Sequence, residues 1–144
     1  MTRIVSFLAP PQQEIHIETS YDLQIVPLGT LRLKIIELVQ QLIKLNNESI
    51  LLAVGRSEFF GRLSALVEAY PWNNFLHLKV ISLYEDLVSS SNSEFLRTAL
   101  GTSNIGETLI SLGAKNNFEY QSNRPIRHGY MSVVIKIANA ITKN

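Results

Sequence analysis

The sequence predicts an all-α fold: an armadillo/HEAT-like α-solenoid, a right-handed array of about six to seven helices. Apolar residues recur at spacings of three and four from Leu31 to Ile141, the period of helices that bury one face. Two stretches 46 residues apart resemble each other, and that repeat length is typical of armadillo and HEAT proteins. Only 17% of the residues are charged, below the usual value of about 25%, so we expect helices covered on more than one side.

A chain of 144 residues is long enough for one ordinary domain. We expect an irregular N-terminal segment over residues 1–27 and a helical module over residues 28–144. Pro10 and Pro11 prevent a helix in the first segment. The alternating stretch "EIHIET" that follows them allows a short extended segment there.

The first half of the helical module contains four expected helices. The first follows Gly29 and Thr30 and carries the stripe Leu31, Ile35, Leu38, Leu42 and Leu45, with Arg32 away from it. Asn residues then offer caps for a short helix over 48–54, and Ser57 opens another over 57–70. Pro71 ends that helix and starts the next, over 71–90. Its predicted stripe consists of Trp72, Leu76, Val80, Leu83 and Leu87, with Trp72 as the first core anchor.

The second half repeats this order. Helices are expected over 93–100 and 103–113, the latter capped by Ser103, followed by a polar loop over 114–129. Tyr130, Val134, Ile137 and Ile141 define the last helix. The stretches "ILLAVGRSEFFGRLSAL" and "FLRTALGTSNIGETLISL" therefore each form a short helix, a Gly and a second helix, before a longer third helix.

Composition excludes several classes of function. The chain has no Cys and a formal net charge of +1, so disulfides, thiolate metal sites and a basic nucleic-acid-binding face are not expected. No apolar run approaches the roughly 18 residues of a membrane span, and Ile4 to Ala9 is too short for a signal-peptide core. We expect a soluble cytoplasmic protein, with the nucleus as the other candidate compartment.

No catalytic motif emerges. "GTSNIGET" nearly matches a phosphate-binding loop, but Glu107 occupies the Lys position and would repel phosphate. His16, His77 and His128 lack the i, i+4 partner of a helical metal site. Nothing indicates a cofactor. The one basic cluster, "RPIRH", could contact an acidic patch on a protein or be a solvated loop.

Three stretches, in order, resemble the SAPS-domain family. They are "PLGTLRLKIIELVQQLIKLNN", "YPWNNFLHLKV" and "RPIRHGYMSVVIKIANAI". The second contains the family's W-N-N-F-L-H hexapeptide in full. The third departs from the family pattern, because Ser132 replaces a Gly and "VVIK" replaces His-Leu-Thr-Arg. The resemblance covers residues 4–144 but only part of the family's longer domain.

The resemblance implies a non-catalytic regulatory or adaptor subunit. Its partner would be a phosphatase-2A-like catalytic subunit of the protein phosphatase six type, with ankyrin-repeat or other adaptor proteins as further candidates. The partner surface that we favour comprises Arg124, Arg127, His128, Tyr130 and Met131, with Asn73, Asn74 and His77 second. The competing interpretation for these last three residues is structural: they cap a helix or satisfy buried backbone groups at the start of the helix.

Three other hypotheses stay open at this stage. The chain could be a general solenoid scaffold with a different partner. It could be a small enzyme that uses His77 or His128, although no residue pair supports this. It could also be a truncated, non-functional relative that lacks the flanking repeats such arrays need and therefore self-associates.

Overall fold

The computed structural model describes residues 1–9, 17–18, 24–115, 117–119 and 125–143. The described residues contain eight helices: α1 (Thr2–Ser6), α2 (Thr30–Lys44), α3 (Glu48–Gly55), α4 (Phe59–Ala69), α5 (Asn74–Val88), α6 (Ser93–Ser103), α7 (Ile105–Ala114) and α8 (Met131–Thr142). Two antiparallel hairpins are also present. One pairs β1 (Ile17–Glu18) with β2 (Gln24–Ile25), and the other pairs β3 (Asn117–Glu119) with β4 (Pro125–Arg127).

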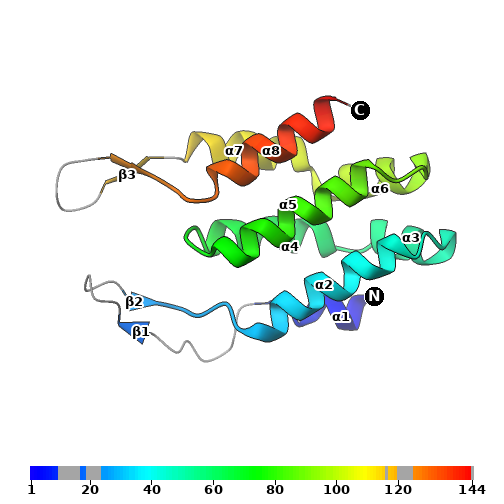
Figure 1. Ribbon diagram of the computed structural model, residues 1–144, viewed down its shortest axis with the longest axis horizontal. Helices are drawn as coiled ribbons and strands as arrows, with labels where there is room; N and C mark the ends of the chain where they lie inside the picture. The colour runs from blue at the N-terminus through cyan, green and yellow to red at the C-terminus, as the bar shows by residue number, and fades with distance from the viewer. Residues whose placement is uncertain (10–16, 19–23, 116, 120–124, 144) are drawn as a thin grey trace.

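The helices form two layers. The three longest helices, α2, α5 and α8, lie side by side in one row, which we call the front row, and α3, α4, α6 and α7 lie behind it (Figure 1). Two units follow each other along the chain, α3-α4-α5 and α6-α7-α8, and α2 occupies the place of a preceding third helix. This packing confirms the helical fold class and is that of a helical repeat array; the handedness stays a prediction.

Asn side chains start three of the helices in the same way. The Oδ1 atoms of Asn47, Asn73 and Asn92 accept hydrogen bonds from backbone N–H groups three residues on, at 3.2, 2.9 and 2.8 Å. Each bond satisfies one of the donors that a helix N-terminus leaves free. The predicted cap at Ser103 is wrong. Ser103 is the buried last residue of α6, and its hydroxyl donates to the Ala99 carbonyl instead.

Aromatic rings join the two units in the core. The Phe60 ring lies 5.7 Å from the Tyr84 ring and 6.5 Å from the Phe95 ring, measured between centroids. A Cβ atom on Gly55 would come within 3.1 Å of the Phe95 ring, so the absence of a side chain lets α3 lie close to α6. This contact explains the Gly in the first of the two similar stretches.

Of the predicted stripe on α2, Ile35 is buried and Leu42 is half-buried, but the other three residues are not buried. Leu31, Leu38 and Leu45 are exposed, whereas the buried face consists of Arg32, Ile35, Ile36, Val39, Gln40 and Ile43. Arg32 can lie in the core because its guanidinium donates to two backbone carbonyls, those of Leu28 at 2.5 Å and Ala9 at 2.6 Å. A buried charge is tolerated when its hydrogen bonds are satisfied in this way.

The N-terminal region has more regular structure than expected. Helix α1 buries Val5 against the core, and the turn after it buries Leu8. Strand β1 falls within the predicted extended stretch "EIHIET", of which only Ile17 and Glu18 lie in the described residues. The expected loop over 114–129 includes the β3–β4 hairpin. No helix in the described part of the chain is long and apolar enough to cross a membrane.

Candidate interaction surface

The corner between α4 and α5 contains the hexapeptide Trp72 to His77. Helix α5 begins at Asn74, after the Asn73 cap, so Pro71 and Trp72 lie in a turn before the helix. The predicted stripe is buried at Leu76, Val80, Leu83 and Leu87, but Trp72 is 48% exposed. Its prediction as a core anchor is therefore wrong, because the cap starts the helix at Asn74, three residues later than predicted.

His77 lies in the core beneath this corner. Its side chain is buried, and its Nε2 atom lies 3.2 Å from the Tyr70 carbonyl at the end of α4. The Nδ1 atom has no hydrogen-bond partner within the described residues. Burial lowers the pKa of His77, and the hydrogen bond to Tyr70 only partly opposes this effect. The imidazole is therefore neutral near pH 7 and holds the end of α4 against the start of α5.

The segment that leads into α8 packs on the same corner. Gly129 lies so close that a Cβ atom there would stand 2.6 Å from the Pro71 carbonyl oxygen. The His128 ring stacks on the Tyr130 ring at 4.9 Å and lies 6.1 Å from the Trp72 ring. Tyr130 is buried, and its hydroxyl lies 3.1 Å from Nδ1 of His128. Two regions that are far apart in the sequence thus form one corner.

The structure brings several of the predicted site residues together here. His128 and Tyr130 pack at the corner, and Met131 is half-buried at the start of α8. Arg127 is the last residue of β4, and only its backbone is described. Arg124 lies outside the described residues.

The three polar residues of the hexapeptide separate. Asn74 is exposed, whereas Asn73 caps α5 and His77 is in the core. Structural roles thus account for Asn73 and His77, and only Asn74 offers a free polar side chain on the surface.

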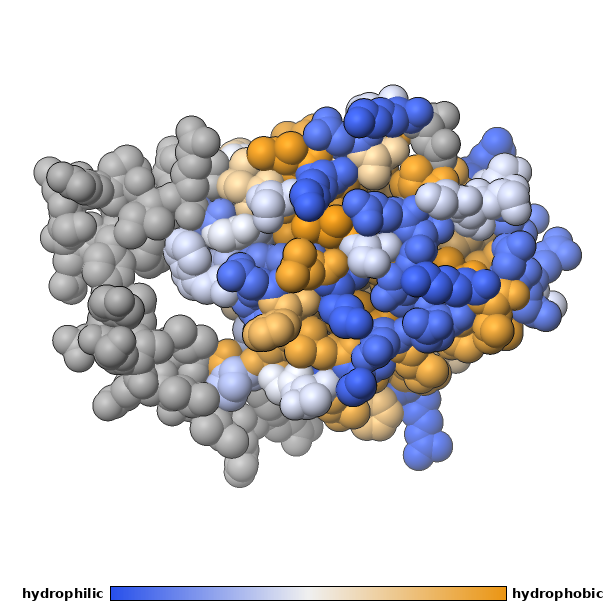
Figure 2. Space-filling view, in the orientation of Figure 1, coloured by the Kyte–Doolittle hydropathy of each residue, from blue (hydrophilic) through white to orange (hydrophobic). Residues whose placement is uncertain are grey.

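Sequence analysis missed the exposed apolar residues of this stretch. Trp72, Phe75 and Leu78 are 48%, 76% and 62% exposed, and their spacing of three places them on neighbouring turns of the chain. We call these three residues the α5 ridge. The sequence did contain a sign of this exposure. Phe75 and Leu78 are large and apolar, yet they lie outside the stripe that was predicted to be buried. Figure 2 shows apolar side chains exposed across the front row, with hydrophilic ones gathering toward the ends of α2 and α5.

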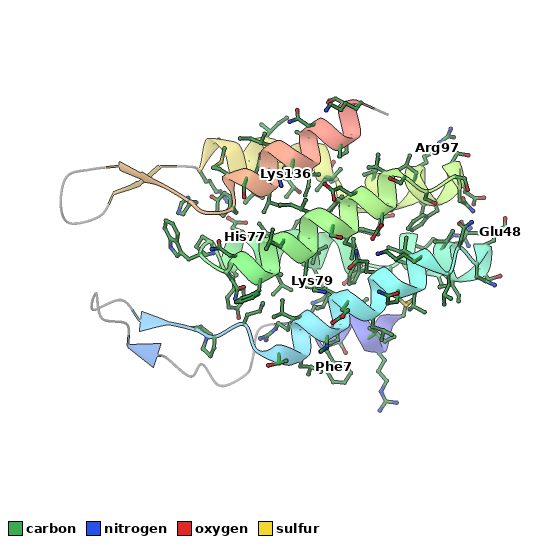
Figure 3. The ribbon with its side chains drawn as sticks, in the orientation of Figure 1. Phe7, Glu48, His77, Lys79, Arg97 and Lys136 are labelled. Atoms are coloured by element: carbon green, nitrogen blue, oxygen red, sulfur yellow. The ribbon has the colours of Figure 1, made fainter. Side chains whose placement is uncertain are left out.

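Lys79, which follows the ridge residue Leu78, forms an ion pair that joins α5 to α2. The Glu37 carboxylate accepts ion pairs from Lys34 at 3.0 Å and from Lys79 at 3.8 Å, and these two cations lower the pKa of Glu37. Figure 3 shows Lys79 between the two helices. One carboxylate between two ammonium groups leaves a net positive charge next to the apolar ridge.

The described residues contain no group of three or more His, Asp or Glu side chains that could hold a metal. The stretch "GTSNIGET" spans the junction of α6 and α7, where Asn104 adopts the left-handed conformation and Glu107 lies in the first turn of α7. The residues before it are helical, as predicted, and not the strand that a phosphate-binding loop follows. The corner is instead a candidate surface for contact with another protein.

The sequence of the chain is similar to those of known proteins. The family model described as SIT4 phosphatase-associated protein matches residues 54–144. The chain is 28% identical over 149 residues to serine/threonine-protein phosphatase 6 regulatory subunit 3 of Gallus gallus, and 28% identical over 150 residues to regulatory subunit 3-A of Xenopus laevis. Each match covers 93% of this chain but 17% of the relative. No solved structure matches. The chain belongs to the SIT4 phosphatase-associated protein (SAPS) family.

Proposed function

We propose that this chain is a helical-repeat module of a phosphatase regulatory subunit and that it binds the catalytic subunit of a protein phosphatase 6 type enzyme. Family membership and the two regulatory relatives support this function. In this proposal the chain performs no catalysis. It holds the catalytic subunit beside a substrate, and the resulting rise in local concentration directs dephosphorylation.

The observation that carries the proposal is the α5 ridge. Two of its three large apolar side chains, Trp72 and Phe75, are exposed in the very hexapeptide that resembles the family pattern, and the third, Leu78, follows directly after it. Leu76 and His77 of the hexapeptide are buried. Exposed apolar patches with a polar rim commonly mark protein-binding sites, and Trp is enriched among the residues that dominate binding energy. The rigid corner beneath the ridge lowers the entropic cost of binding.

The sequence-derived surface adjoins the ridge through His128, whose ring faces Trp72. We therefore include the segment from Arg124 to Met131 in the proposed contact area. Ankyrin-repeat adaptors as further partners and a cytoplasmic location stay predictions that the resemblance suggests.

A matched pair of variants tests the ridge. Phe75 on α5 and Ile110 on α7 are equally exposed, at 76% and 75%, but only Phe75 belongs to the ridge. We expect Phe75→Ala to weaken binding to purified phosphatase 6 catalytic subunit by about tenfold or more, as for an interface anchor. Ile110→Ala should leave binding unchanged. Biolayer interferometry with the full chain immobilised measures both.

The outcomes separate the competing functions. Binding that survives Phe75→Ala but not a joint Arg124→Ala and Arg127→Ala change would move the contact to the basic segment. A folded chain that does not bind the catalytic subunit at all would refute the proposal and favour a scaffold with another partner. Hydrolysis of p-nitrophenyl phosphate by the purified chain alone would contradict the non-catalytic role.

A further inference from the structure

A pocket lies where the end of α1 meets the turn between α3 and α4. Its volume is about 360 Å³, within the range of roughly 300–1,000 Å³ that is typical of ligand sites. Its walls come from α1, from the turn and from the first turn of α4: Val5, Ser6, Arg56, Ser57, Glu58 and Arg62. None of these residues belongs to α5 or α8, so the pocket is separate from the corner that carries the α5 ridge. We call it the arginine pocket.

Two guanidinium groups supply the free hydrogen-bond donors of this pocket. Arg56 and Arg62 stand on either side of the α3–α4 turn and line the same space. The hydroxyls of Ser6 and Ser57 already donate to backbone carbonyls, at 2.9 and 2.6 Å. Recognition of a ligand therefore falls to the two guanidinium groups, each of which presents five N–H donors in a planar fork.

The ion pairs of these two residues use few of those donors. A single nitrogen of Arg56 contacts the Glu94 carboxylate, at 3.4 Å, and both side chains are more than half exposed. Two nitrogens of Arg62 donate to the same oxygen of Glu58, at 3.2 and 2.9 Å. Exposed pairs of this kind contribute little to stability, so an anion that binds more strongly displaces the carboxylates at low cost.

The charge of the pocket favours a phosphoryl group over a carboxylate. Two Arg residues and one Glu in its walls leave one net positive charge. A phosphate monoester carries about −1.5 to −2 charges near pH 7 and has three acceptor oxygens, so it can accept from both guanidinium groups at once. Arginine clusters are a recurring means of recognising phosphorylated segments of proteins.

An anionic membrane fits this pocket less well than a phosphorylated side chain. Membrane surfaces attract clusters of roughly four to eight Lys and Arg residues, whereas the arginine pocket has two Arg residues with Glu58 between them in the sequence. A recess with two guanidinium groups matches one phosphoryl group that projects from a chain.

We propose that the arginine pocket binds the phosphoryl group of a phosphoserine or phosphothreonine side chain in another protein. The phosphoryl oxygens replace the Glu58 carboxylate on Arg62 and also accept from Arg56. In a phosphatase regulatory subunit, such a pocket retains a phosphorylated protein near the catalytic subunit. That role rests on the proposed function, whereas the binding itself does not.

Fluorescence anisotropy of the full chain with a short labelled peptide tests the binding, in the absence of any phosphatase. The peptide consists of Gly and Ala around one phosphoserine, and the same peptide with unmodified Ser is its control. We expect saturable binding of the phosphopeptide, at least about tenfold tighter than that of the control. Failure here leaves the phosphatase contact of the α5 ridge untouched, because that contact is measured separately.

Variants of the two guanidinium groups locate the site. Arg56→Gln and Arg62→Gln should each weaken phosphopeptide binding about tenfold or more, as expected for lost charge-assisted hydrogen bonds. Arg97→Gln is the matched control, since Arg97 is exposed on α6 and is not among the pocket residues. Circular dichroism reports the fold of each variant. Arg56→Lys and Arg62→Lys keep the charge but lose the planar fork, and they replace any variant that loses helicity.

Removal of the competing carboxylate gives the opposite effect. Glu58→Gln should tighten phosphopeptide binding, whereas Glu48→Gln, the same charge change at an exposed position that does not line the pocket (Figure 3), should leave it unchanged. Three results would overturn the proposal. They are a phosphopeptide that binds no better than its control, binding that survives both Arg variants, and binding to vesicles containing phosphatidylinositol phosphate without binding to the phosphopeptide. Inorganic phosphate that competes as well as the phosphopeptide would assign the pocket to the free ion instead.

Discussion

Replacing Gly129 by Ala should break the corner that carries the α5 ridge. A Cβ atom at this position would lie 2.6 Å from the Pro71 carbonyl oxygen, 3.5 Å from the Trp72 ring and 3.7 Å from the His77 ring. The nearest atom belongs to the backbone, so no side-chain rotation relieves the overlap. Pro71 and Gly129 must separate by at least 0.4 Å to reach even 3.0 Å. Overpacking of this kind typically costs about 1–3 kcal/mol of the free energy of unfolding.

Urea denaturation measures this loss, because the unfolding free energy falls linearly with denaturant and its extrapolation to zero urea gives the stability in water. Trp72 is the only Trp in the chain, and its half-exposed ring beside His128 makes its fluorescence a local reporter of the corner. We expect Gly129→Ala to lower the unfolding midpoint and to shift the Trp72 emission of the folded state.

Gly101→Ala provides the matched control. Gly101 lies inside α6, and a Cβ atom there meets nothing within 4 Å. Ala is a better helix former than Gly, so this change should stabilise the chain by up to about 1 kcal/mol. An unchanged midpoint and unchanged emission in Gly129→Ala would refute the close packing of Gly129 on Pro71.

Three further changes test the corner and the core. Asn73→Ala removes the α5 cap and should cost about 1 kcal/mol in urea denaturation, whereas Asn74→Ala, at the adjacent exposed position, should stay within about 0.5 kcal/mol. Arg32→Lys cannot reproduce a buried guanidinium that donates to two carbonyls, and the free energy of unfolding should fall by about 1–3 kcal/mol; an equal fall for the exposed Arg97→Lys would contradict this reasoning. Burial lowers the pKa of His77 in the folded chain, so unfolding takes up a proton below the unfolded pKa of about 6.5. His77 should therefore make the free energy of unfolding fall with decreasing pH, by no more than about 1.4 kcal/mol per pH unit. If His77→Gln leaves this pH dependence unchanged, another titratable group causes it.

Helical periodicity located the helices well but did not identify the buried face of α2. Leu31, Leu38 and Leu45 repeat at helical spacing, and so do the residues of the true core face, among them Ile36 and Val39. The true core face also includes Arg32. A charged residue in this face argued against burying it. The deciding interaction is the hydrogen bond from Arg32 to the Ala9 carbonyl, a contact across 23 positions of sequence that periodicity does not contain.

The corner shows the same division between local and long-range information. The W-N-N-F-L-H stretch was recognisable in the sequence, as was an Asn residue suited to cap a helix. Its contact with Gly129 depends on the packing of α8 against α5, and that contact determines which residues the corner exposes. The exposed fraction of Trp72 or Phe75 follows from where the cap starts the helix, and the start predicted from the sequence was three residues too early.

Two apolar surfaces therefore remain exposed on this small array. The α5 ridge lies in the middle of the front row on a corner held by Asn73, His77 and Gly129, so a partner meets a preformed surface and orders little on binding. Leu31, Leu38 and Leu45 are instead exposed on α2, a different helix from the one that carries the ridge. Phe75→Ala should consequently weaken phosphatase capture, whereas Leu38→Ala should leave it unchanged. A Leu38→Ala chain that loses capture would show that the contact extends onto α2.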